Sequence, residues 1–202
     1  MRGPLCAFVT SIAMVLSGCG GGGESGSGSG DAKDEPSASP AASYFVKADT
    51  DAINAASVQA QKAGARAQSA KAKAACNKAG DRGYEAWRTC WHKLLNPIEK
   101  ALRDLATQLR TLSGRDFSED CVAALRAAQE AFATFAAVVD GLRSGIDSKR
   151  RATQVRTLRI YDATLGEISK GFAEPFQAVV QACYSPEDLA KIKARSSPSP
   201  SD

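Results

Sequence analysis

The chain lacks most of the residues from which enzyme sites are built. Its 202 residues include one histidine, His92, and two methionines, Met1 and Met14, both near the N-terminus. One histidine cannot supply a two-histidine zinc site or paired Glu-x-x-His motifs for di-iron, and no Ser-His-Asp relay is recognisable around it. A Cys-x-x-Cys-His motif for covalent haem and a glycine-rich phosphate loop are also missing. The sequence therefore predicts a non-enzymatic protein without catalytic residues, metal or cofactor.

Aromatic residues are scarce as well, at 6% of the chain, whereas alanine is abundant and hydrophobic residues reach 44%. Strands favour branched and aromatic side chains, and alanine is the best helix former. This composition favours an all-α fold of closely packed helices.

The N-terminal residues have the pattern of an export signal. Arg2 precedes a twelve-residue apolar run, Leu5–Leu16, which is much shorter than the roughly 20 residues of a membrane-spanning helix. The run ends in Leu16-Ser17-Gly18-Cys19, which resembles the lipobox of bacterial lipoproteins. The resemblance implies cleavage before Cys19, lipidation of its thiol with diacylglycerol and further acyl chains such as palmitate, and anchoring in the cell membrane or outer membrane. An ordinary secretory signal with a chance cysteine is the alternative.

The rest of the chain divides by composition. Residues 19–42, rich in Gly, Ser and Pro, are expected to form a flexible tether after residues 1–18 of the signal peptide. Residues 43–195 carry apolar periodicity, and residues 196–202 form a Ser/Pro-rich tail that we expect to be disordered. We expect one extracytoplasmic helical domain on a lipid anchor.

Four long segments repeat apolar residues at helical spacing, namely 49–75, 81–112, 118–143 and 153–183. These stripes are expected to face the core. The first stripe is made almost entirely of alanine and includes Ala70 and Ala74, and the fourth includes Val155. Short connections between long helices favour antiparallel neighbours, so the pattern predicts an up-down-up-down four-helix bundle. A short fifth helix is expected to begin at Ser185-Pro186, with the serine as cap. Pro97 and Pro175 are expected to kink their helices.

Four cysteines remain after Cys6 in the signal and Cys19 in the lipobox, and they permit three disulfide pairings. Cys76 and Cys90 lie seven residues on either side of Gly83, so a hairpin there brings them level. Cys121 begins the third apolar stripe and Cys183 ends the fourth, and antiparallel helices bring these two together. The pairing predicted is therefore Cys76–Cys90 and Cys121–Cys183. Glycine at position 145 places the third turn near 146, whereas the midpoint of the second pair is 152.

Charge is distributed unevenly. Residues 19–42 carry a net charge of −3, whereas residues 43–201 hold 24 Lys and Arg against 17 Asp and Glu, a net charge of +7. In the predicted bundle one end gathers cations that are candidates for anion binding: Lys78, Arg82, Arg143, Lys149, Arg150 and Arg151. Such a cluster would attract an acidic envelope protein or an anionic polymer, although a solvated surface is the alternative. Nucleic acid is not expected, because the compartment is extracytoplasmic and no aromatic residue interleaves the basic run.

A tryptophan cluster offers a second hypothesis. Tyr84, Trp87 and Trp91 recur at helical spacing, which is typical of a core but is also compatible with a ligand platform. The leading interpretation is a lipoprotein that presents a helical bundle for contact with a protein or polymer. The alternatives are a small-molecule receptor with a pocket between helices near the tryptophans, and an inhibitor or immunity-type lipoprotein.

Overall fold

The computed structural model describes residues 43–196, which are helical apart from an N-terminal segment and short connections. Its helices are α2 (Lys47–Gln68), α3 (Ala70–Ala79), the 3-10 turn η1 (Gly80–Arg82), α4 (Tyr84–Leu112), α5 (Glu119–Asp147), α6 (Arg151–Gly171), α7 (Ala173–Cys183) and α8 (Pro186–Ser196). The all-α prediction is confirmed for these residues. The predicted signal, the lipobox with Cys19 and the tether of residues 19–42 lie outside the described residues, as do residues 197–202.

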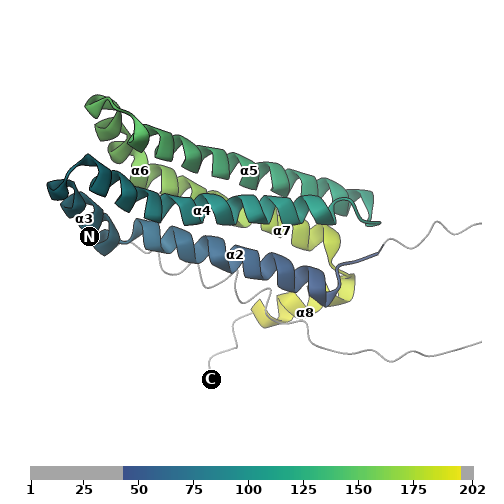
Figure 1. The fold of residues 1–202 in the computed structure, drawn as a ribbon. Coiled ribbons are helices and arrows are strands. Elements are labelled where there is room, and N and C mark those ends of the chain that lie inside the picture. Colours follow the sequence, from purple (N-terminus) through teal and green to yellow (C-terminus); the bar gives the residue numbers. More distant parts are fainter. Residues whose placement is uncertain (1–42, 197–202) are drawn as a thin grey trace, which may run out of the picture.

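The long helices lie side by side, with the short α8 near one end, next to the first part of α2 (Figure 1). α4 packs against α5 and α2, while α5 also contacts α6 and α7, and α3 folds back along the start of α4. The core is formed by the apolar stripes of these helices. Leu95, Leu105, Leu125 and Phe132 are fully buried between α4 and α5 and their neighbours.

Both predicted disulfides are present. Cys76 on α3 is bonded to Cys90 on α4, and Cys121 on α5 is bonded to Cys183 at the end of α7. The hairpin between α3 and α4 turns at Gly83, whose φ of 105° is a backbone conformation that favours glycine. The two crosslinks therefore close opposite ends of the helix bundle.

The prediction of one continuous helix over residues 49–75 is wrong. The chain breaks at Ser69, which has an extended conformation, so that α2 and α3 replace one helix. The hydroxyl of Tyr161 donates to the free carbonyl of Ala67 at 3.3 Å, and α3 then buries Cys76 and Ala79 instead of continuing the alanine stripe. Ala70 and Ala74, which the stripe placed in the core, are exposed.

The predicted third turn is also wrong. α5 continues through Gly145 to Asp147, which leaves only residues 148–150 as connection. The later turn accounts for about half of the offset from the Cys121–Cys183 midpoint. The fourth predicted helix is divided at Phe172, three residues before Pro175, whose nitrogen cannot donate to the carbonyl of Gly171. α4, by contrast, runs without interruption through Pro97.

Gly145 explains how closely α5 and α6 approach. A Cβ atom added to Gly145 would lie within 3.0 Å of the Cβ of Thr157 on α6, and nearer still to its hydroxyl oxygen. The glycine is therefore required by packing between helices, whereas the sequence pattern had assigned it to a turn.

The fifth helix begins as predicted. The backbone N–H of Asp188 donates to the hydroxyl oxygen of Ser185 at 3.2 Å, and Pro186 occupies the first helical position.

α5 is the one helix of residues 43–196 that is long and apolar enough to cross a membrane, judged by length and composition alone. Its apolar stripe is packed in the core: Leu125, Phe132, Val139 and Ile146 are fully buried against neighbouring helices. Core packing accounts for this stripe, and exposed alanines on the other side of the helix contribute the rest of its apolar character.

Candidate functional site

The chain enters the helical domain at the end that holds the Cys121–Cys183 disulfide, which we name the clamped pole. Ser43 forms a bridge with Phe117 in the connection between α4 and α5, and the N–H of Phe45 donates to the carbonyl of Cys183 at 2.9 Å. The ring of Phe45 packs against those of Phe117 and Tyr184, with centroids 5.3 and 5.7 Å away. The clamped pole thus fixes where the preceding residues leave the domain.

The buried carboxylate at the clamped pole is paired. Asp49, whose side chain is only 7% exposed, forms an ion pair with Arg115 and accepts the N–H of Val46 at 3.1 Å. The guanidinium of Arg115 also lies over the ring of Phe117, 5.1 Å from its centroid. A buried carboxylate is tolerated only when it is paired in this way, so these contacts are structural.

The opposite end of the bundle carries unpaired cations, and we name it the basic pole. It comprises Lys78 and Arg82 beside the α3–α4 turn, with Lys149, Arg150 and Arg151 in and after the α5–α6 connection. The two connections are neighbours, because the Tyr84 hydroxyl near the start of α4 donates to the carbonyl of Ile146 at 3.3 Å. All five side chains are exposed, and none forms an ion pair within residues 43–196.

Arg143, the sixth predicted anion-binding residue, differs from the others. Its guanidinium lies 3.0 Å from the carboxylate of Glu99 on α4 and also pairs with Asp140. Glu99 is buried and takes a second arginine, Arg103, at 2.9 Å. Arg143 therefore neutralises a buried carboxylate between α4 and α5, and we remove it from the candidate site.

Arg88 and His92 tie the start of α4 to the end of α5. Arg88 donates from Nε to Asp147 at 2.5 Å, and the Nε2 of His92 lies 2.7 Å from the same oxygen. Partial burial by itself raises the pKa of Asp147, but the hydrogen bonds from Arg88 and His92 outweigh it and hold the pKa below its usual value. His92, the only histidine of the chain, thus joins α4 to α5 at the rim of the basic pole.

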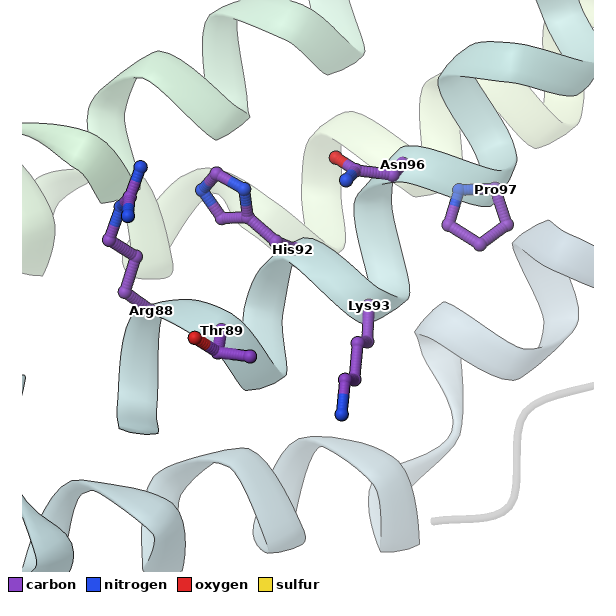
Figure 2. Close-up of a pocket in the computed structure, with 6 residues that line it drawn as sticks. All are labelled: Arg88, Thr89, His92, Lys93, Asn96 and Pro97. Atoms are coloured by element: carbon purple, nitrogen blue, oxygen red, sulfur yellow. The ribbon is translucent and has the colours of Figure 1, made fainter. Parts of the chain in front are cut away.

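Two shallow hollows lie on the outward face of α4, next to this cluster. The first, of about 490 Å³, is lined by Arg88, Thr89, His92, Lys93, Asn96 and Pro97. Figure 2 shows Lys93 directed away from Arg88, His92 and Asn96, so these side chains do not converge on one point. The second, of about 400 Å³, shares Thr89 and Lys93 with it and extends to Arg82. The cationic side chains in the lining, Arg88 and Lys93 in the first hollow and Arg82 and Lys93 in the second, would favour an anionic group, although Glu85 and apolar surface also line the second.

The tryptophan cluster is divided between core and surface. Trp91 is buried, with its ring 5.0 Å from that of Tyr161, and its Nε1 has no hydrogen-bond partner in the described part of the chain. Trp87 is half-buried and Tyr84 is 40% exposed. The core interpretation is confirmed for Trp91, which packs against the ring of Tyr161.

Sequence reasoning missed the outward face of α6. Arg156 and Arg159 are exposed and continue the basic pole along this helix. Val155, which the stripe had placed in the core, is 40% exposed, and Ile160 is 48% exposed. The signal was present in the sequence, because residues 148–161 contain five Lys and Arg and no Asp or Glu.

Within residues 43–196, no group of three or more His, Cys, Asp or Glu side chains has the geometry to hold a metal ion. The chain matches no family model, no curated protein and no solved structure.

Proposed function

We propose that the chain is a lipid-anchored, extracytoplasmic, non-enzymatic protein whose basic pole contacts an acidic envelope protein or an anionic polymer. Cys19 carries the anchor in this proposal, and residues 19–42 form the tether. We interpret the helices as an up-down-up-down four-helix bundle in which α2 with α3, α4, α5, and α6 with α7 are the four members and α8 is an addition.

One observation carries the proposal: the chain enters at the clamped pole, and the unpaired cations lie at the other end. α4 has 29 residues and runs from one pole to the other, which corresponds to about 43 Å at 1.5 Å per residue. A tether that leads from the membrane to the clamped pole would hold the basic pole away from the bilayer. Cations in that position are placed to meet a partner in the surrounding envelope.

The charge pattern supports an anionic partner. Arg150 and Arg151 lie beside the positive end of the α6 dipole, and no acidic residue occurs in the first turn of that helix. The potential at the basic pole is consequently positive over two adjacent connections, and such a field accelerates association with acidic surfaces.

A small-molecule receptor is the second candidate, and the hollows on α4 favour it. Their lining includes Arg82, Lys93 and Asn96, which would select an anionic ligand. We expected a pocket between helices near the tryptophans. The hollow beside Pro97 instead opens on the outward side of α4. Titration with small carboxylates and phosphates, followed by tryptophan fluorescence, separates this candidate from the first.

The anchor is tested by labelling growing cells with a palmitate analogue and partitioning the protein between detergent and water. We expect label and detergent partition for the wild type, and loss of both for Cys19→Ala. Wild-type protein that remains unlabelled in the aqueous phase would contradict the proposal.

The contact surface is tested by chemical crosslinking of the lipidated protein in its native envelope. Arg150→Glu with Arg151→Glu should abolish the major crosslinks. Arg110→Glu with Arg126→Glu is the matched control, because both residues are exposed arginines near the clamped pole without an ion pair in the described chain. Crosslinks that survive the first pair of substitutions unchanged would exclude the basic pole as the contact surface.

A further inference from the structure

The outward face of α6 combines positive charge with exposed apolar side chains. α6 turns Thr157, Tyr161 and Leu165 into the core. The opposite side presents Val155 and Ile160, which are 40% and 48% exposed. These two residues are five positions apart on the helix, about 7.5 Å at 1.5 Å per residue, and Arg156 and Arg159 lie between them in sequence.

This face is electrostatically unfavourable in the isolated chain. Arg150 caps the helix without a side-chain hydrogen bond, where an Asp or Ser would stabilise the helix and a cation opposes its dipole. Arg156 and Arg159, one turn apart, add repulsion between like charges.

Two other helices in the described chain carry ion pairs between exposed residues of the same helix. α2 pairs Lys47 with Asp51, and α4 pairs Lys100 with Asp104, each at 2.5 Å and with four-residue spacing. The first half of α6 has no such pair. An acidic partner would supply the missing charges.

We propose that the outward face of α6, formed by Arg151, Val155, Arg156, Arg159 and Ile160, is a docking surface for an acidic protein that carries apolar side chains. This inference rests on the proposed function and narrows it to one class of partner. A partner with carboxylates around aliphatic side chains would pair the arginines and remove Val155 and Ile160 from water.

The exposed apolar residues Val155 and Ile160 indicate that the partner is a protein and not a polymer. A polyanionic polymer such as polyphosphate neutralises the arginines but has no aliphatic groups to cover Val155 and Ile160. Arginine is enriched in protein interfaces but also binds phosphate well, so the arginines do not separate the two partners and the apolar side chains do. Three of the five residues of this face are arginines, and none is lysine.

The test compares two synthetic probes with the full-length mature chain: poly-glutamate, and a peptide of equal charge in which leucines interrupt the glutamates. We expect the wild type to bind the leucine-containing peptide about tenfold more tightly, because two half-exposed aliphatic side chains become buried. Val155→Ser with Ile160→Ser should remove this preference and leave poly-glutamate binding unchanged. Val138→Ser, at a valine of α5 that is 39% exposed, is the matched control and should retain the preference.

Equal binding of both probes by the wild type would overturn the inference, as would a preference that survives Val155→Ser with Ile160→Ser. Neither result contradicts the proposal that the basic pole binds an anionic partner. If neither probe binds, the inference fails too, and the crosslinking experiment alone decides the proposed function. Melting temperatures of all variants show whether each is folded.

Discussion

Asp49 at the clamped pole and the arginines of the basic pole differ in burial and in pairing. At the clamped pole the carboxylate of Asp49 is buried, paired with Arg115 and hydrogen-bonded to the backbone. At the basic pole Arg150 and Arg151 extend into solvent without an acidic partner in the described chain, beside a helix end that repels them. Paired and buried charges contribute to the stability of the fold, whereas exposed unpaired charges of one sign do not. The difference indicates that one pole maintains the structure and the other is available for contact.

The disulfides give the largest expected contrast between the poles. Replacing Cys121 and Cys183 by serine opens a loop closed over 62 residues and should lower the free energy of unfolding by about 4 kcal/mol. The same change at Cys76 and Cys90, 14 residues apart, should cost about 3 kcal/mol. Urea denaturation of both double variants measures the difference. If the variant without Cys76–Cys90 lost as much free energy of unfolding as the other, or more, the clamped pole would not be the more stabilising end.

Gly145 tests the packing beneath the basic pole. Gly145→Ala forces a methyl group against Thr157 and should cost about 2 kcal/mol by overpacking. Gly141→Ala is the control on the same helix, because no atom lies within 4 Å of its added Cβ, and it should stabilise by up to about 1 kcal/mol. Thermal unfolding of both variants distinguishes close approach from simple helix propensity. A stabilising Gly145→Ala would show that α5 and α6 are farther apart than described.

Tyr161 connects stability to pH in the same half of the molecule. Burial raises the pKa of its hydroxyl above the usual value of about 10, so its contribution is complete below pH 10 and is lost as the pH rises beyond it. At pH 11 the wild type should have lost about 1.4 kcal/mol relative to Tyr161→Phe, which cannot ionise there. Denaturation of both proteins at pH 8 and pH 11 gives this difference and cancels the effect of the lysines. A constant difference would contradict the burial of Tyr161.

The smallest expected effect is a gain. Arg150→Asp replaces an unfavourable cap of α6 by a favourable one and should raise the free energy of unfolding by about 1 kcal/mol. The same substitution should weaken binding of poly-glutamate, because it reverses a charge of the basic pole. If Arg150→Asp lowered both the free energy of unfolding and the binding of poly-glutamate, Arg150 would be a structural residue. The contrast between a stabilising pole and a binding pole would then be wrong.

Much of the fold could be predicted because its signals are local or geometric. The turn at Gly83 places Cys76 and Cys90 opposite each other on neighbouring helices. Antiparallel packing places Cys121 opposite Cys183 in the same way. The cap at Ser185 is a local pattern that the structure repeats. The unpaired cations at residues 149–151 were identified from charge alone.

The errors arise where tertiary contacts override a local pattern. Nothing in an alanine-rich stripe marks the break at Ser69, which depends on Tyr161 reaching the carbonyl of Ala67. Arg143 belongs to a cluster of basic residues in sequence, but its partner Glu99 is 44 positions away. Gly145 has the composition of a turn, although its role is to let Thr157 approach. Each case required knowledge of which helices are neighbours.

The central claim, that one pole stabilises and the other binds, is tested most directly by measuring stability and envelope crosslinking on the same two variants. Asp49→Ala should lower the free energy of unfolding by about 2 kcal/mol, because it removes the hydrogen bonds of a buried charge, and should leave the crosslinks of the folded protein intact. Arg150→Ala with Arg151→Ala should change stability by less than about 0.5 kcal/mol and remove the crosslinks. The opposite result, with unchanged crosslinks and a large loss of stability for the arginine pair, would contradict the account.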